Sequence, residues 1–284
     1  MIEVVLPGGF ERHGAWQHRV WLRPWSGHDE ARLAEAEPTA SCAARTTALL
    51  ASCLTLDGGD TPATPELARQ LTVGDREALL LHLRKMTLGE RLACVLTCPA
   101  CGERMDLDLL VSDLLVAPYG RERQSHSVTI ADGEDVFRVR FRLPTGADQE
   151  VAAALVAGDA EQAVRLVLAR CVVDVVAANG HAMEELPLAV ARRLPALMAE
   201  LDPQAELRLE AECPTCGAPF ATLFDAAGYV QQEITQASGE LFREIHLLAY
   251  HYHWSEAEIL ALTGPRRRRY LGLLAETLPK EHAQ

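Results

Sequence analysis

The sequence predicts an α+β fold that is predominantly helical, with a split β module between N-terminal and C-terminal helical regions. Three observations support this prediction. Apolar residues recur at helical spacing through most of residues 28–88, strand-like stretches flank two copies of one cysteine motif, and helical periodicity returns from Phe224 onward. We therefore expect three parts: residues 1–88 form a small β element followed by helices, residues 89–223 form the split β module with a helical insertion, and residues 224–284 form the C-terminal helical region.

The composition is that of an ordinary globular protein. Of the 284 residues, 49% are hydrophobic and 24% are charged, whereas disordered chains are poor in apolar residues. No stretch of 18 apolar residues occurs, and the N-terminus lacks the basic and apolar regions of a secretory signal. We therefore expect a cytoplasmic protein without a membrane span.

The charge balance limits the possible partners. The chain has 40 acidic and 27 basic residues, which gives a formal net charge of −13. Because such a surface repels polyphosphates on average, nucleic acid is a disfavoured partner unless a local basic patch holds it.

In the first part of the chain, the sequence predicts strands and then helices. Residues 4–27 carry bulky apolar residues between polar ones and include a turn signal at residues 7–9, which together predict a hairpin. A short helix is expected over residues 29–37. Further segments with helical spacing of alanine and leucine predict helices at 39–54, 65–71 and 74–86.

The middle of the chain changes to a strand pattern. Residues 91–111 predict a strand, a tight knuckle and a second strand, and residues 127–144 predict a hairpin whose tip lies at Asp132 and Gly133. A strand at 206–212 leads into a second knuckle. Between these strands the spacing predicts helices at 148–155, 161–173 and 188–201.

The strongest signal is a duplicated cysteine motif, C-P-x-C-G. Cys98 and Cys101 belong to the first copy, Cys213 and Cys216 to the second. Two residues between cysteines allow both sulfurs to face one point, and the closing glycine can take a positive φ. Four thiolates are natural ligands of a tetrahedral Zn²⁺. Since 111 residues separate the two copies, the predicted module is a four-cysteine zinc ribbon split by a long insertion.

The cysteines have other interpretations. A single CxxC can be a redox dithiol, but such motifs usually open a helix, and a second matching copy then lacks an explanation. Cys94 lies four residues before Cys98 and could replace a ligand, as could a histidine, although a buried thiol is the simpler interpretation. Cys42, Cys53 and Cys171 lie in apolar helical stretches and are predicted core residues.

The sequence lacks a catalytic constellation. Four thiolates leave no open position for a metal-bound water, and the motifs HExxH and GxSxG, the Walker loop and the glycine-rich dinucleotide turn are absent. The HxE at residues 28–30 is not followed by the PCxxC of a deaminase. We therefore predict that the zinc is structural and that the protein is not an enzyme.

The C-terminal region gathers histidine, aromatic and arginine residues. His246, Tyr250 and His253 lie at i, i+4 and i+7, a spacing that suits a metal-binding face but is more simply explained by packing or by contact with a partner. A run of four arginines at 266–269 begins the last helix, where positive charge opposes the helix dipole. We expect the run to face acidic groups of the chain itself or of a partner protein, or, least favoured, a phosphate backbone.

Resemblance to a known family rests on four segments: the tail LFREIHLLAYHYHWSEAEILALTGPRRRRYLGLL, the knuckle segment LTVGDREALLLHLRKMTLGERLACVLTCPACGERMDLDL, the stretch FRVRFRLPTGADQE, and the second knuckle with its helix, CPTCGAPFATLFDAAGYVQQEI. These segments are similar to zinc-knuckle-bearing members of the T4-type baseplate hub assembly chaperone family. That family is found with contractile phage tails and phage-like contractile injection systems. The resemblance spans roughly residues 1–275.

The resemblance implies a non-enzymatic cytoplasmic protein that binds baseplate, hub or spike subunits and assists their assembly. Tyrosine, tryptophan and arginine are favoured at protein interfaces. We therefore expect a partner surface made of Tyr250, Tyr252, Trp254, Arg266, Arg267, Arg268 and Arg269. The alternative is a zinc-ribbon regulator that binds nucleic acid, but acidic residues such as Glu103 and Glu212 beside the knuckles disfavour it.

Overall fold

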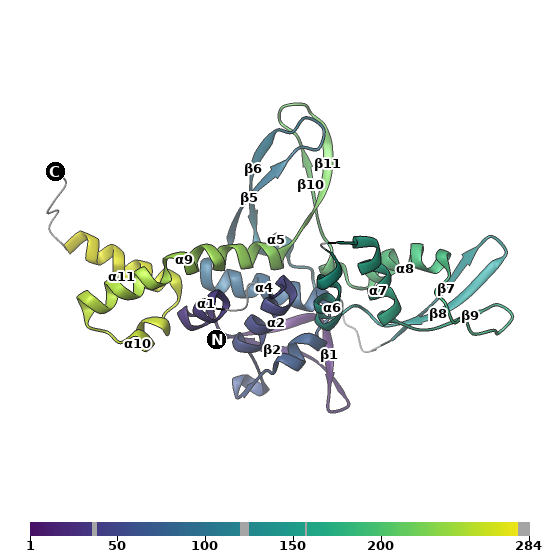
Figure 1. The fold of residues 1–284 in the computed structure, drawn as a ribbon, viewed down its shortest axis with the longest axis horizontal. Helices are drawn as coiled ribbons and strands as arrows, with labels where there is room; N and C mark the ends of the chain where they lie inside the picture. The colour runs from purple at the N-terminus through teal and green to yellow at the C-terminus, as the bar shows by residue number, and fades with distance from the viewer. Residues whose placement is uncertain (36–38, 120–124, 157, 278–284) are drawn as a thin grey trace.

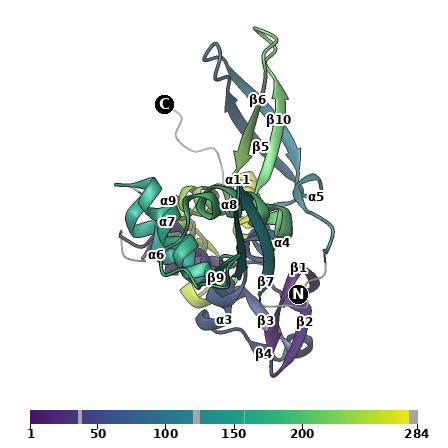
Figure 2. The ribbon, with the colours of Figure 1, turned by 90° about the vertical axis from the view of Figure 1, so that its right-hand side faces the viewer.

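A computed structural model describes residues 1–35, 39–119, 125–156 and 158–277. Figure 1 shows a central body with three projecting parts: a pair of long hairpins above it, a small sheet with helices on the right, and a group of helices on the left that ends the chain. Figure 2 shows from a second direction that the two hairpins rise together, away from the body.

The prediction of a predominantly helical fold is wrong. About 50% of the described residues are helical and 27% are strand, in four small antiparallel sheets, so the fold is a balanced α+β mixture. The N-terminal part contains a four-stranded sheet in which the last two strands have only three and two residues. In addition, the helix expected at 161–173 ends early: α7 (Ala160–Cys171) stops where the β-branched run of β9 (Val172–Ala177) begins, because valine packs better on a pleated surface.

The body consists of a sheet covered by helices. Its strands lie in the order β1 (Ile2–Arg12), β2 (Ala15–Leu22), β3 (Leu54–Leu56) and β4 (Thr61–Pro62), with a 3-10 turn at Asp57–Gly59 between the last two. The covering helices are α1 (Gly27–Ala34), α2 (Cys42–Cys53), α3 (Pro65–Gln70) and α4 (Val73–Leu88). Ser41, Thr64 and Thr72 each accept a backbone N–H at the start of α2, α3 and α4, which fixes where these helices begin.

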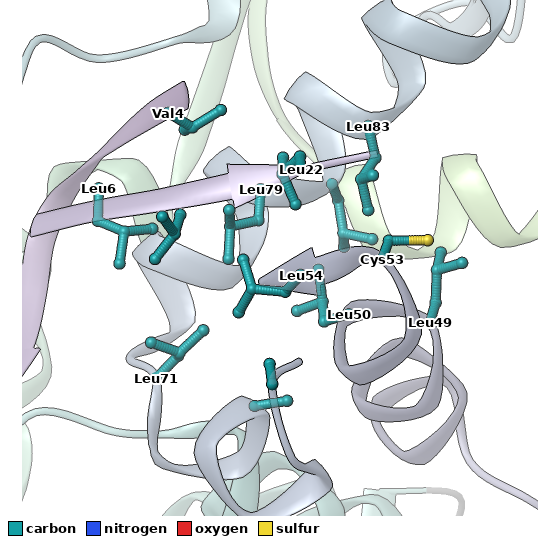
Figure 3. Packing of buried hydrophobic residues seen from close by; sticks show 14 of the residues in the cluster. Val4, Leu6, Leu22, Leu49, Leu50, Cys53, Leu54, Leu71, Leu79 and Leu83 are labelled. Carbon is teal, nitrogen blue, oxygen red and sulfur yellow. The ribbon is translucent and has the colours of Figure 1, made fainter. Parts of the chain in front are cut away.

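The core of the body lies between the sheet and the helices. Figure 3 shows Leu6 and Leu22 of the sheet meeting Leu50 and Leu79 of α2 and α4, and Leu54 at the start of β3 completes the contact. All five side chains are buried. Burial of leucines stabilises a fold by about 1.5–3 kcal/mol each, so this cluster holds α2 and α4 on the sheet.

The turn signal at residues 7–9 has a different role from the predicted one. These residues lie inside β1, where the pairing register with β2 shifts between Val5 and Phe10. The hairpin turn is at His13 and Gly14, both with positive φ. The bulge allows the backbone N–H groups of Gly8 and Gly9 to donate to the buried Asp75 of α4, at 2.7 and 3.3 Å, so it ties the sheet to that helix.

A buried carboxylate anchors α1 to the sheet. Asp29 accepts hydrogen bonds from Arg23 at 2.7 Å, from the backbone N–H of Ser26 at 2.8 Å and from the hydroxyl of Ser52 at 2.6 Å. Burial alone would raise the pKa of Asp29, but these hydrogen bonds, led by that of Arg23, lower it to about 2. The ionised form therefore stabilises the folded state.

We expect Asp29→Asn to lower the free energy of unfolding by about 1–2 kcal/mol at pH 7. Because the pKa is lower in the folded state, the stabilisation is complete above the unfolded value near 4 and is lost as the pH falls through about 2. The difference between wild type and variant in urea denaturation should therefore shrink from pH 5 to pH 2. Asp60→Asn, at an exposed position, is the control; an equal loss there would contradict the assignment.

The insertion between the two cysteine motifs folds around a core of its own. Strands β7 (His126–Asp132), β8 (Asp135–Phe141) and β9 pair in that order. Helices α6 (Gly146–Val156), α7 and α8 (Leu188–Leu201) accompany them, and the cluster that joins sheet and helices includes Val139, Phe141, Leu168 and Leu194. Helix α9 (Ala226–Tyr252) packs on the body through Val230 and Ile234, and its end forms the third projection together with α10 (Glu256–Leu260) and α11 (Gly264–Thr277). Among the described residues, every helix is too short or too polar to cross a membrane.

Candidate metal centre

Two hairpins bring the cysteine motifs together. The first consists of β5 (Arg91–Thr97) and β6 (Arg104–Leu110), and the second of β10 (Leu207–Glu212) and β11 (Pro219–Phe224). Alternation of apolar and polar residues gives each hairpin one apolar face, and these faces meet in a cluster that includes Leu92, Leu109, Leu207 and Phe224. The cluster also contains Leu81 of α4, so the base of the hairpin pair packs on the body, next to α5 (Val111–Leu114).

Each knuckle closes with the same backbone hydrogen bonds. In the first, the N–H of Gly102 donates to the carbonyl of Cys98 at 2.9 Å, and in the second the N–H of Gly217 donates to the carbonyl of Cys213 at 2.8 Å. Both glycines have positive φ, 76° and 70°, a conformation that other residues adopt only at a cost. The repeated C-P-x-C-G motif therefore forms the same tight turn twice.

The four motif cysteines lie together at the tips of the hairpins. The sulfurs of Cys98, Cys101, Cys213 and Cys216 are all within 4.8 Å of one another. The Sγ atoms of Cys98 and Cys216 are 3.8 Å apart, and those of Cys101 and Cys213 are 3.6 Å apart. A disulfide requires about 2.05 Å, whereas four sulfurs at about 2.3 Å from one tetrahedral ion lie about 3.8 Å from each other. The arrangement is compatible with a bound metal ion.

The surroundings of the four sulfurs suit metal ligands. Cys98 and Cys213 are buried at 1% exposure, while Cys101 and Cys216 face solvent. Backbone N–H groups of Cys216 and Thr215 point at the sulfur of Cys213 and lower its pKa to about 7, against the effect of desolvation. The pKa values of Cys101 and Cys216 are raised, because hydrogen bonds with the neighbouring thiols outweigh the backbone hydrogen bonds that lower them. The cluster contains cysteine only, and soft thiolates of this kind favour zinc over magnesium or calcium.

The remaining cysteines lie elsewhere. Cys94 is on the inner face of β5 and is buried, but it does not belong to the sulfur cluster. Cys53 and Cys171 are buried, as predicted, and burial raises their thiol pKa values to about 12 and about 11. Cys42 was expected in a core but is exposed at the N-terminal end of α2. Within the described residues, no histidine joins the metal cluster.

The aromatic residues of the predicted partner surface divide into two groups. Tyr252 and Trp254 pack on Tyr270 of α11, with ring centroids 5.9 and 4.9 Å from it, and so join α9 to α11 within the chain. Tyr250 points outward at 69% exposure and stacks on His246 at 6.3 Å. His253 leaves the face expected for it because α9 ends at Tyr252 and His253 takes a left-handed conformation.

The four arginines also divide. Arg267 is fully buried and donates both to Glu244, at 2.7 Å, and to Glu30 of α1. The arginine run was expected to face acidic groups of the chain itself, a partner protein or a phosphate backbone. For Arg267, the first of these is correct. Arg266, Arg268 and Arg269 are exposed. Sequence reasoning missed the two glutamates, because they lie far from Arg267 along the chain and only the fold brings them together.

These features define a mixed α+β protein with a cysteine-only site at the tips of two hairpins and with three separate projections. A family model described as T4 bacteriophage base plate protein matches residues 10–227. The match covers more than half of the chain, and the chain therefore belongs to this family. No curated protein and no solved structure matches it. Family membership supports a structural baseplate role and suggests a non-enzymatic protein.

Proposed function

We propose that this baseplate protein is an assembly chaperone or structural accessory of the hub, in a contractile phage tail or a contractile injection system, and that it acts in the cytoplasm. The match to the baseplate family over residues 10–227 supports the baseplate role. The resemblance of the C-terminal helices to hub assembly chaperones supports the finer assignment. The partners are then baseplate, hub or spike subunits.

The chain is further proposed to hold one structural Zn²⁺ through Cys98, Cys101, Cys213 and Cys216. The observation that carries this proposal is the convergence of four sulfurs from two knuckles that are 111 residues apart in the sequence. Four thiolates fill a tetrahedral shell, so no position is left for a reacting water. The ion would close the long insertion and fix the hairpin tips, which a small apolar cluster holds only at their base.

The exposed part of the predicted partner surface is proposed to bind other subunits. It comprises Tyr250 with Arg266, Arg268 and Arg269, residue types that are favoured at interfaces. Tyr252, Trp254 and Arg267 support this surface from within, because they hold α11 against α9 and α1.

Co-expression with the hub and spike subunits of the same particle tests the function. We expect the full chain to co-purify with at least one of these subunits and to contain one zinc per chain by elemental analysis. Arg266→Glu with Arg269→Glu should weaken co-purification at least tenfold, while Arg192→Glu on α8, also exposed, should not. Failure of the wild-type chain to bind any hub, spike or baseplate subunit would overturn the proposal.

A further inference from the structure

A pocket of about 400 Å³ lies where α1, α2 and α9 meet. Leu33, Ala34 and Ile234 form apolar walls, and the rest of the lining is Arg45, Gln231, Thr235, Ser238 and Gly239. The pocket lies well away from the cysteine cluster, since its residues belong to the body and to the middle of α9 (Figure 1).

Arg45 is the unusual residue of this pocket. Its Nε is buried and has no hydrogen-bond partner, and the guanidinium forms no ion pair with any residue that the structure describes. A buried N–H without an acceptor is costly. The Arg45 side chain as a whole is half-buried at the pocket, so water can reach the rest of the guanidinium, while an acceptor for the Nε would have to come from a molecule that enters the pocket.

Gly239 lines the same pocket and leaves room for a close approach to α9. It lies inside α9, where glycine is less favourable than alanine. A Cβ added at Gly239 would meet no atom within 4 Å, so packing within this chain does not explain why the position lacks a side chain. A partner backbone that approaches α9 closely at this point would explain it.

From Gly239 the exposed face of α9 continues as an aromatic stripe. Thr235, Gly239, Phe242, His246 and Tyr250 follow one another at intervals of four, three, four and four residues, which places them on one side of the helix. Phe242 is 58% exposed and Tyr250 is 69% exposed. Exposed aromatics in line are typical of protein interfaces rather than of free surface.

Charge complementarity defines the occupant. The stripe itself carries no acidic residue, Arg45 lies at one end of it, and the exposed residues Arg243 and Glu240 flank it. Arg45 and Arg243 suit carboxylates, while Phe242 and Tyr250 suit apolar side chains. A polyphosphate would leave the apolar side chains of the stripe uncovered.

We propose that the Arg45 pocket and the α9 stripe together bind an acidic, amphipathic segment of a partner protein. One carboxylate of this segment pairs with Arg45, its backbone passes close to Gly239, and its apolar side chains cover Phe242 and Tyr250. The contact extends over about 15 residues of helix, about 22 Å. The inference rests on the proposed function for the existence of a protein partner. Its α9 stripe lies beyond residue 227, outside the family match, whereas Arg45 lies within it.

The test uses the full zinc-loaded chain and a fluorescein-labelled peptide of about 16 residues, made of glutamate, leucine and alanine with the leucines at helical spacing. We expect saturable binding by fluorescence anisotropy, and no binding of the same peptide with lysine in place of glutamate. Arg45→Met and Gly239→Leu should each weaken binding at least tenfold. Gly239→Leu should also raise the midpoint of thermal unfolding, since it removes a helical glycine without a clash.

Matched controls separate binding from folding. Gly272 of α11 is equally open to an added Cβ, so Gly272→Leu should raise the unfolding midpoint and leave the peptide affinity within twofold of wild type. Arg192→Met, which removes an exposed arginine elsewhere, should also leave the peptide affinity within twofold. Failure of the wild type to bind the acidic peptide, equal binding by the variants and wild type, or preference for a duplex oligonucleotide probe would overturn the inference. If hub subunits still co-purify with the wild-type chain in that case, the proposed function stands without it.

Discussion

Replacing Cys98 and Cys213 together by serine is expected to reduce the zinc content from one ion per chain to none and to unfold the hairpin pair. Structural zinc supplies on the order of 10 kcal/mol or more to small zinc-binding modules. Apart from the four sulfurs, the described residues of the two hairpins meet in an apolar cluster at their base. Elemental analysis should show the loss of metal, and limited proteolysis should cleave within residues 91–110 and 207–224 while the body, which has its own core, resists.

The remaining cysteines provide matched controls for this experiment. Cys94→Ser tests the possibility that Cys94 is a ligand, and Cys42→Ser changes an exposed thiol far from the cluster. Both variants should retain one zinc and the protease resistance of wild type. Retention of zinc by the double variant, or its loss from Cys94→Ser alone, would contradict the assignment of the four motif cysteines.

Arg267→Ala is expected to lower the free energy of unfolding by about 3–5 kcal/mol, because it leaves Glu30 and Glu244 buried without their cation. Burial already raises the pKa of Glu30, against the opposing effect of Arg267. Without Arg267, the buried carboxyl of Glu30 should bind a proton more readily in the folded state than in the unfolded state. The loss of stability should therefore be smaller at pH 5 than at pH 8, measured by chemical denaturation.

Two further variants distinguish the effect of the buried triad of Arg267, Glu30 and Glu244 from a general effect of charge. Arg266→Ala removes an exposed neighbouring arginine and should change stability by no more than about 0.5 kcal/mol. Arg267→Met combined with Glu30→Met and Glu244→Leu replaces the whole ionic group by apolar side chains of similar volume and should recover most of the stability. An equal effect of Arg266→Ala and Arg267→Ala would refute a specific role for the triad.

The parts of the structure that sequence alone predicts well are those with local signals. The two knuckles follow from cysteine, proline and glycine within five residues, and the flanking hairpins from alternating apolar residues. That alternation also predicts which faces of β5 and β10 turn inward. The meeting of the four sulfurs needed one further step, the chemical argument that two matching pairs of thiols serve one ion.

The parts that sequence reasoning missed depend on contacts between distant segments. Leu54–Leu56 is a strand because it pairs with β2, although it continues an alanine- and leucine-rich helical pattern. The glycines near residue 8 form a bulge because Asp75 accepts their N–H groups. Arg267 is buried because Glu30 and Glu244 lie beside it in the fold. Such contacts between distant segments override local propensity.

The length of α9 has a consequence for assembly. Its 27 residues form one continuous rod of about 40 Å, which starts beside the hairpin pair and ends at the helices that close the chain (Figure 1). The rod holds these two ends at a constant separation and a constant rotation about its axis. Two neighbouring subunits that bind opposite ends of α9 would therefore be held at a fixed distance and in a fixed orientation relative to each other.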